Sequence, residues 1–482
     1  MKRILIAVAI FVSSLAHGQL ADDLTTQTST LPSAPVPQSQ PIPSLTPDPK
    51  AQTAAPQSPT VTPLSSSQVG AATQSSTPLS LTVKQAEALA LKNNPLVSVA
   101  QLTALASQEV TREARSALWP TATANLTGVD AEPNSRITAG GLNNPIIYDR
   151  AAAGVTVSQL ITDFGRTKNL VSSADLSAKA AGQNAVVTKE QILLAVDQAF
   201  YGALQAQAVV AVAHQTEGAR QNVADQVGAL FKNKLKSQLD FSFANVNLAQ
   251  AQLLVLDAEN NVNAALATLS MVLGYRDTQN FALVEDATSI TPPSSNVDDL
   301  IAQALVARPE ILSLQFQEQA AQKFHSAERD LLLPNIAAVG AVGDTPVRNP
   351  VLSNWYGAVG VNVQIPLFNG FLYTARSREA ALRAQAAHDR VLDLRNRISR
   401  DVRAGWLNAN TAYSRLSVTQ QLLGQANLAL DLAQTRYNMG LSSIVELSQA
   451  QLQQTQAQIS NAQASYDFRL ASAILRYETT GI

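Results

Sequence analysis

The feature that most constrains the fold of this chain is an internal duplication. When the sequence is shifted by 206 residues, apolar and glycine positions of one half fall on similar residues of the other half. Because such a repeat means that one structural unit occurs twice, the fold has to consist of two similar halves. The matched pairs are Val157 and Val363, Ala174 and Ala380, Leu176 and Leu382, Ile192 and Ile398, Val196 and Val402, Phe200 and Trp406, and Gly218 and Gly424.

Each half reads as a helix, two strands, a very long helix, a turn and a further helix. The pattern predicts long helices over about 166–233 and 371–438, each roughly 100 Å long at about 1.5 Å per residue. Their shorter partners are predicted over 81–118, with an interruption near Pro95, and 237–274 in the first half, and over 298–332 and 443–478 in the second. Two short helices therefore fit end to end beside each long one.

Four segments have the composition of β-strands, namely 121–132, 151–161, 335–344 and 355–368. A polar connection with glycine and proline separates the first two. Each segment has roughly the nine to eleven residues that a tilted strand needs to cross a bilayer. In the last segment the side chains alternate, so that one face would meet lipid and the other water. One face holds Trp355, Gly357, Val359, Val361 and Val363, and the other holds Tyr356, Ala358, Gly360, Asn362 and Gln364.

An open sheet of four strands would leave two unpaired edges in lipid. Each unsatisfied backbone group there costs several kcal/mol, and only a closed barrel removes the edges. Four strands cannot enclose a pore, so closure requires several chains. Three chains would give twelve strands, with their helices continuing as a tube, although the sequence does not specify the number of chains.

The N-terminal region has the features of an exported protein. In residues 1–18, Lys2 and Arg3 precede an apolar run that ends in small residues, which predicts a signal peptide cleaved before Gln19. Residues 19–80 carry 11 of the 22 prolines among Ser, Thr and Gln, which predicts a disordered tether. The repeats are expected at 81–274 and 298–480, and the linker 275–297 is expected to pack around the waist of the helices.

Charge and motif content exclude several classes of function. The formal net charge is −2, which gives no basic footprint for nucleic acid. The chain has no cysteine, and no nucleophile motif is present. We therefore expect neither an enzyme nor a bound cofactor or metal. The four histidines, His17, His214, His325 and His388, have no partner at metal-ligand spacing.

The segment 434–451, QTRYNMGLSSIVELSQAQ, interrupts an otherwise continuous helical pattern with Gly440. A glycine costs about 1 kcal/mol relative to alanine inside a helix, which favours a turn here. The 206-residue shift sets 231–235 on 437–441 without a gap. Both halves are therefore predicted to reverse direction at the equivalent point.

These features together resemble the TolC-like outer-membrane efflux proteins, the trimeric exit ducts of bacterial drug-efflux pumps and type I secretion systems. The resemblance covers about 81–480. It rests on RYNMGLSSIVEL at 436–447, QIPLFNG at 364–370, SQLITDFG at 158–165 and the doubled order of elements. It implies a mainly α-helical fold with a transmembrane β-barrel: four strands per chain, a trimeric 12-stranded barrel and a long periplasmic α-helical tube.

The resemblance also implies a gate at the periplasmic end of the tube. By position, Tyr437 matches a gating tyrosine, Ser442 the site of a gating arginine, Glu446 and Gln449 two ring carboxylates, and Asp240 an acidic partner held across hairpins. Ser442 and Gln449 depart from the family pattern. Three Glu446 side chains around one axis would repel one another and attract cations. We expect a closed state that depends on packing and hydrogen bonding by Tyr437 more than on ion pairs.

The hairpin turns are implied as the docking surface for a periplasmic adaptor. The docking residues are Lys234, Leu235, Gly440, Leu441 and Ser442, of which Lys234 stands where the family usually has glycine. Trp355 and Phe368 flank the last strand segment and are predicted to anchor it at the membrane interface.

The implied protein is a homotrimer in the outer membrane of a Gram-negative-type bacterium, in contact with outer-membrane lipid and with most of the chain in the periplasm. The implied partners are an adaptor and an inner-membrane pump of RND, ABC or MFS type. The implied function is passive export of small molecules, with the outer-membrane channel of type I protein secretion as the alternative. A secreted coiled-coil structural or adhesive fibre without a pore is a hypothesis of a different class, but it leaves both strand pairs unexplained.

Overall fold

The computed structural model divides into two units, Met1–Thr73 and Gln74–Ile482. The structure describes residues 79–129, 136–139, 142–146, 150–285, 290–345 and 353–481. The predicted signal peptide and nearly all of the predicted tether lie outside these residues. Leu79 and Ser80, which the sequence assigns to the tether, belong to strand β1, so that prediction extends two residues too far.

The first repeat consists of α1 (Val83–Asn93), α2 (Pro95–Ser116), β2 (Thr121–Val129), β5 (Arg150–Thr162), α3 (Arg166–Lys232) and α4 (Gln238–Val272), preceded by β1 (Leu79–Leu81). The interruption predicted near Pro95 is confirmed, because proline has no N–H, and Asn94 caps α2 by accepting from Leu96 N at 2.9 Å. Between β2 and β5 the chain forms a further hairpin of β3 (Arg136–Ala139) and β4 (Leu142–Ile146), where the sequence predicts only a connection.

The second repeat has the same order. It consists of α5 (Val297–Ala307), α6 (Pro309–Arg329), the 3₁₀ turn η1 (Asp330–Leu332), β7 (Asn335–Asp344), β8 (Trp355–Gln364), α7 (Leu372–Asn438) and α8 (Ile444–Thr480). Pro309 breaks the helix predicted over 298–332 in the way that Pro95 breaks its counterpart. Strand β8 ends at Gln364 rather than at Phe368, because Pro366 cannot donate to a strand ladder.

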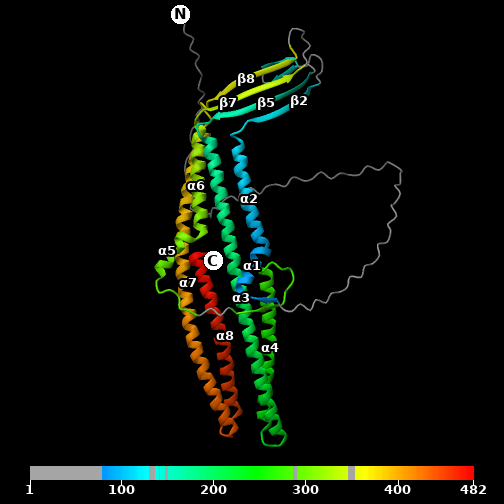
Figure 1. Cartoon of the computed structure of the whole chain (residues 1–482), viewed down its shortest axis with the longest axis vertical. Coiled ribbons are helices and arrows are strands. Elements are labelled where there is room, and N and C mark those ends of the chain that lie inside the picture. The colour runs from blue at the N-terminus through cyan, green and yellow to red at the C-terminus, as the bar shows by residue number, and fades with distance from the viewer. Residues whose placement is uncertain are drawn as a thin grey trace, which may run out of the picture. The chain divides into compact units, whose positions relative to one another are not determined.

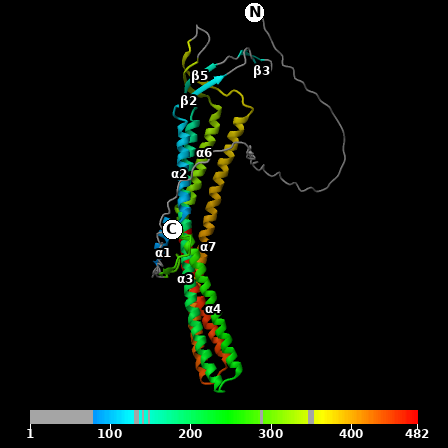
Figure 2. The same cartoon turned by 90° about the vertical axis from the view of Figure 1, so that its right-hand side faces the viewer.

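The fold class predicted from the sequence is confirmed as mainly helical with four principal strands. The long helices α3 and α7 have 67 residues each, and each differs from its predicted range by one residue at one end. α2 and α4 pack along α3, and α6 and α8 pack along α7, so that short helices follow one another beside each long one. Within this unit, α3 also packs against α6 and α8, which joins the repeats along their length (Figures 1 and 2).

The four principal strands form one antiparallel sheet in the order β2-β5-β7-β8. Figure 1 shows it next to one end of α2, α3, α6 and α7. Strands β5 and β7 join the two repeats, and β2 and β8 are the edges. The strand register gives the sheet two chemically different faces, because directly opposed residues share a face.

One face of the sheet is apolar except for Gln159 of β5 and Asp344 of β7. It comprises Ala122, Ala124 and Leu126 of β2, Val155 and Val157 of β5, Gly340 and Val342 of β7, and Val359, Val361 and Val363 of β8. The other face comprises Thr121, Thr123 and Asn125 of β2, Thr156 and Ser158 of β5, Val339 and Ala341 of β7, and Tyr356, Asn362 and Gln364 of β8. On this polar face the Thr123 and Thr156 hydroxyls are 2.7 Å apart.

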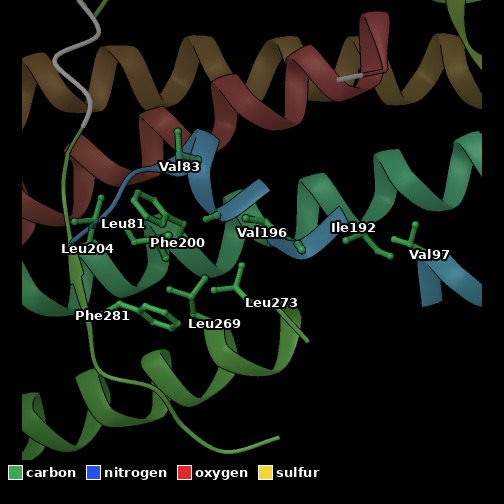
Figure 3. Close-up of a cluster of buried hydrophobic side chains, with 12 residues drawn as sticks. Leu81, Val83, Val97, Ile192, Val196, Phe200, Leu204, Leu269, Leu273 and Phe281 are labelled. Atoms are coloured by element: carbon green, nitrogen blue, oxygen red, sulfur yellow. The ribbon is translucent and has the colours of Figure 1, made fainter. Parts of the chain in front are cut away.

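The main hydrophobic core lies where α1, α3, α4 and two short strands meet (Figure 3). Strand β1 pairs in parallel with β6 (Phe281–Leu283), which belongs to the predicted linker. Phe200, Leu269 and Leu273 are almost completely buried here. Burying one side chain of this size contributes about 1.5–3 kcal/mol, so this junction fixes the helices relative to one another.

Candidate functional site

Helix α7 ends in a tight turn at the segment that interrupts the helical pattern. Gly440 N donates to Tyr437 O at 3.0 Å, and Leu441 N donates to Arg436 O at 2.8 Å. This pair of bonds is the Schellman arrangement that terminates a helix. Gly440 has a φ of 74°, a left-handed conformation that glycine adopts without steric cost. The glycine is thus a helix terminator.

Helix α3 ends in the same turn, with lysine in the place of glycine. Lys234 N donates to Phe231 O at 2.8 Å, and Leu235 N donates to Leu230 O at 2.8 Å. Lys234 has a φ of 59°, the same left-handed region as Gly440. This conformation costs about 1–2 kcal/mol for a residue with a Cβ atom. The two hairpins therefore share a backbone and differ in side chains.

The helices that follow the turns are capped by equivalent serines. Ser237 Oγ accepts from Asp240 N at 3.1 Å, and Asp240 Oδ2 accepts from Ser237 N at 3.1 Å, which completes a capping box. Ser443 Oγ likewise accepts from Glu446 N at 3.4 Å. The Glu446 carboxylate instead pairs with Arg436 Nε at 3.1 Å, across the two arms of one hairpin. Sequence reasoning missed Arg436 because it considered an arginine only at position 442.

Tyr437 is the most deeply buried of the predicted gate residues, with 4% of its surface exposed. It packs in a cluster with Val227 and Ala244 of the first repeat and with Ile444 and Leu447 of the second. The two hairpins are thus held together by apolar contact around this ring. Such packing supports the expectation that the closed tip depends on burial.

The electrostatic surroundings of Tyr437 differ from those expected. Lys236 Nζ lies 4.4 Å from the centroid of the ring, a cation–π contact between the repeats. The phenol oxygen has no hydrogen-bond partner among the described residues, so the expected hydrogen bond of Tyr437 is not made within that part of the chain. Burial, and then the charge of Asp240, raise the pKa of Tyr437 and keep the phenol neutral.

The remaining predicted gate residues surround this cluster. Glu446 and Gln449 are exposed, and Ser442 is half-buried with an Oγ that has no partner in the described part of the chain. A polar contact that the sequence did not indicate joins the hairpins, because Asn247 Nδ2 donates to Ser448 Oγ at 2.6 Å. The predicted docking residues lie at the turns. Lys234 and Gly440 are exposed, and Leu235 and Leu441 are 69% and 68% exposed.

The predicted interface anchors flank β8. Trp355 is its first residue and is 64% exposed. Phe368 lies four residues beyond its end, is 80% exposed and makes an edge-to-face contact with Phe371, with ring centroids 5.8 Å apart. Both rings are therefore exposed on the surface of this chain and can contact the membrane interface.

Two sets of acidic side chains at the helix junction were missed entirely, one around the buried Asp197 and one around Arg308. Asp197 of α3 is fully buried, and its Oδ2 accepts from Arg476 Nη2 of α8 at 3.2 Å. Burial, and then the charge of Glu87 on α1, raise the pKa of Asp197 to about 7, although Arg476 opposes the shift. Its Oδ1 has no partner among the described residues. A side-chain hydrogen bond between Asp197 and Glu87 also raises this pKa, because it requires a proton on one of the two carboxyl groups.

The second set consists of Glu190, Glu310 and Glu478, which lie around Arg308 at the break between α5 and α6. Arg308 is buried, and its guanidinium lies 2.7 Å from Glu310 Oε1, 2.5 Å from Glu478 Oε2 and 5.2 Å from the Tyr477 ring centroid. Burial, and then the charge of Glu310, raise the pKa of Glu190 to about 7. Glu190 and Asp197 are seven residues apart on α3, a spacing that places both on one face of the helix. That spacing is the signal from which sequence reasoning could have found them.

Within the described part of the chain, no three His, Cys, Asp or Glu side chains are grouped in a way that would hold a metal ion. His214 lies 3.4 Å from Glu259, and His388 lies 3.0 Å from Glu318. His17 is outside the described residues. None of the described helices combines the length and apolarity of a bilayer-spanning helix.

The duplicated long helices, the paired hairpin turns and the two-faced sheet define a channel-forming class of outer-membrane protein. The sequence profile of the outer membrane efflux protein family matches residues 88–275 and 300–477, one segment in each repeat. The chain therefore belongs to the outer membrane efflux protein family. It is an outer-membrane export channel of the kind that serves tripartite pumps or type I secretion.

Individual relatives are similar over most of their length. The outer membrane protein TolC of Vibrio cholerae is 24% identical over 80% of this chain and 88% of its own. The alkaline protease secretion protein AprF of Pseudomonas aeruginosa is 23% identical over 81% of this chain and 82% of its own. The solved structure of CusC has a TM-score of 0.73 at 17% identity, covering 83% of this chain and 92% of that chain. The family consists of passive channels. Membership in it favours a channel over the hypothesis of a secreted fibre.

Proposed function

We propose that three copies of this chain form one continuous duct. In it the four-stranded sheets close into a transmembrane barrel of twelve strands, and the long helices form a periplasmic tube. The observation that carries this proposal is the sheet with one apolar face and two open edges. Within the described residues, β2 and β8 each pair on one side only. Pairing β8 of one copy with β2 of the next removes every edge.

The helices supply a second surface for assembly. Large apolar side chains are exposed at heptad-like spacing on two different helices of one chain. Those on α4 are Leu239, Val246, Leu253 and Leu256, and those on α7 are Leu407, Val418, Leu422 and Leu432. Because the two stripes lie on different surfaces, contact between them is head-to-tail, which produces a closed ring when the rotation closes.

The hairpin tips form the gate of this duct. Tyr437, Ser442, Glu446, Gln449 and Asp240 surround its periplasmic mouth. A buried hydroxyl without a partner costs about 1–3 kcal/mol, and this cost is recovered when the hairpins separate and water reaches Tyr437 Oη. The packed tip is therefore poised between the closed and open states, with the cluster around Tyr437 favouring closure.

The duct works with partners on the periplasmic side. A periplasmic adaptor docks at both turns and links the duct to an inner-membrane pump of RND, ABC or MFS type. Trp355 and Phe368 anchor the barrel at the membrane interface, residues 1–18 direct export, and residues 19–78 act as a tether. The principal cargo is small molecules. Protein export is the alternative. It is supported by the similarity to AprF, which is named for the secretion of alkaline protease.

Cysteine crosslinking of the two sheet edges tests the assembly. The natural chain has no cysteine, so every disulfide comes from introduced positions. One cysteine at Val359 of β8 is combined in turn with single cysteines along 121–128 of β2. We expect a dimer and trimer ladder that stops at three in at least one variant. A ladder that continues beyond three, or only monomer throughout the scan, contradicts the proposal.

A matched control uses neighbouring strands of one chain. Thr123 and Thr156 are opposed in β2 and β5, so cysteines there crosslink within the chain. This variant produces no ladder on a denaturing gel. It shows that crosslinks between β2 and β8 report contact between copies.

A further inference from the structure

The two hairpin turns share a backbone but present different chemistry. Residues 232–236 of the first turn contain three lysines and no acidic residue, whereas the equivalent residues 438–442 of the second carry no charge. We infer that the first turn binds an acidic surface of the periplasmic partner and the second binds an apolar one. This inference rests on the proposed docking at the turns, and it assigns the kind of surface that each turn fits.

The lysines at the first turn are available for a partner. Lys232 and Lys234 are exposed and form no ion pair with the described residues. The nearest acidic residue in sequence, Asp240, is committed to its own helix, since its Oδ2 accepts from Ser237 N and from Ser237 Oγ at 2.8 Å. Lys236 lies over the ring of Tyr437. The first turn therefore carries three positive charges, and neither Lys232 nor Lys234 is neutralised by an ion pair with a described residue.

The conformation of Lys234 is an independent observation in favour of a binding role. Its left-handed φ of 59° costs about 1–2 kcal/mol for any residue with a Cβ atom, and the equivalent Gly440 shows that glycine fits the same turn. A side chain held in a costly backbone conformation is typical of functional positions. The charge at this point is thus kept at the expense of stability.

Each turn also offers an exposed leucine at its apex. Leu235 is flanked by Lys234 and Lys236, whereas Leu441 lies between the uncharged Gly440 and Ser442, and Met439, two residues earlier, is 67% exposed. The partner of the first turn therefore combines an apolar contact with Asp or Glu side chains around it, and the partner of the second is apolar. Charge complementarity of this kind governs which partner fits and how quickly it associates.

Photocrosslinking at the two leucines tests the inference in cells that produce the full chain and its export system. Benzoylphenylalanine replaces Leu235 in one strain and Leu441 in another, and the adducts are quantified and sequenced. In the wild-type background we expect adducts at both positions, with Asp or Glu in the partner segment joined to position 235. Partner segments without acidic residues at position 235 overturn the inference.

Charge-altered versions of both strains complete the test. The double change Lys232→Glu and Lys234→Glu should reduce the adduct at position 235 by about tenfold or more, because opposed like charges disfavour contact, and leave that at 441 within about twofold. The double change Lys232→Arg and Lys234→Arg should keep both adducts. No loss at 235, or an equal loss at both positions, overturns the inference.

Conductance of the purified natural chain in planar bilayers separates this inference from the proposed duct, because no docking partner takes part in that measurement. If the natural chain does not conduct, the proposed duct is wrong. If it conducts and the crosslinks do not respond to charge, only the inference about the turns is wrong. Lys323→Glu, an exposed charge reversal on α6, is the control for net charge.

Discussion

At the scale of single residues, the ring of Tyr437 and its hydroxyl have opposite effects on the closed tip. The ring fills the cluster between the hairpins, whereas the buried Oη has no partner among the described residues. Tyr437→Phe should therefore stabilise the closed arrangement by about 1–3 kcal/mol. The expected result is a higher melting temperature and a lower open probability in planar bilayers.

Tyr466→Phe is the matched control for Tyr437→Phe. Its hydroxyl lies 3.5 Å from Glu285 Oε2, so removing it deletes a hydrogen bond and should not stabilise the protein. A lower melting temperature for Tyr437→Phe would show that the hydroxyl is bonded in the assembled protein. That result would support a hydrogen bond from Tyr437 Oη to another copy of the chain.

Asp197 makes stability depend on pH near neutrality. Its pKa of about 7 in the fold exceeds the usual value of about 4, so the folded chain holds a proton there that the unfolded chain releases. The free energy of unfolding therefore falls as pH rises from about 4 to about 7, by on the order of a few kcal/mol per chain. Glu190 acts in the same direction. Melting temperature should be lower at pH 8 than at pH 5.

Asp197→Asn should reduce this dependence on pH. The amide keeps a donor for Glu87 and carries no charge at any pH, so the variant should melt above the natural protein at pH 8. Asp431→Asn, at an exposed position on α7, should leave the pH dependence as it is in the natural protein. An unchanged slope in Asp197→Asn would show that Asp197 does not share a proton with Glu87.

Residues whose role depends on neighbours in the sequence were predictable. Ser443 and Glu446 were placed at a turn by the repeat, and they form a cap there. Arg436 and Asn247 were missed because their partners come from other helix arms, 10 and 201 residues away. A partner at such a separation leaves no mark on local periodicity.

At the scale of elements, the two turns provide an internal comparison of lysine and glycine. Lys234→Gly removes the Cβ from a left-handed position and should stabilise the first hairpin by about 1 kcal/mol. Lys232→Gly is the control, because residue 232 is the last of α3 and glycine there costs helix stability, up to about 1 kcal/mol. The melting temperature should rise in the first variant and fall in the second. The reverse order would contradict the turn geometry.

The long elements were predictable and the short ones were not. Helices α3 and α7 repeat their apolar pattern over 67 residues, so one residue that departs from the pattern does not alter the prediction of a helix. Strands β1 and β6 have three residues each and depend on pairing across about 200 residues, which periodicity does not reveal. The break at Pro309 was readable in principle, since the residue before a proline disfavours helix, and Pro95 marks the same point in the first repeat.

At the scale of the whole molecule, the sheet connects the sequence to the channel. The alternation seen in one strand extends over all four in the observed register, which gives the sheet its apolar and polar faces. Such a sheet is complete only when its edges are paired. Sequence reasoning reached the need for several chains from this argument, but the number of copies depends on barrel curvature, which side-chain patterns do not encode.

Ion selectivity measured on single channels tests the central claim most directly, because it requires both a continuous duct and a ring of Glu446 at its mouth. The purified protein is inserted into planar bilayers under a salt gradient, and the reversal potential is compared with that of Glu446→Gln. We predict discrete conductance steps with a preference for cations, and a clear loss of that preference in the variant. The absence of conductance steps would contradict the duct, and an unchanged cation preference in Glu446→Gln would contradict the assignment of the gate.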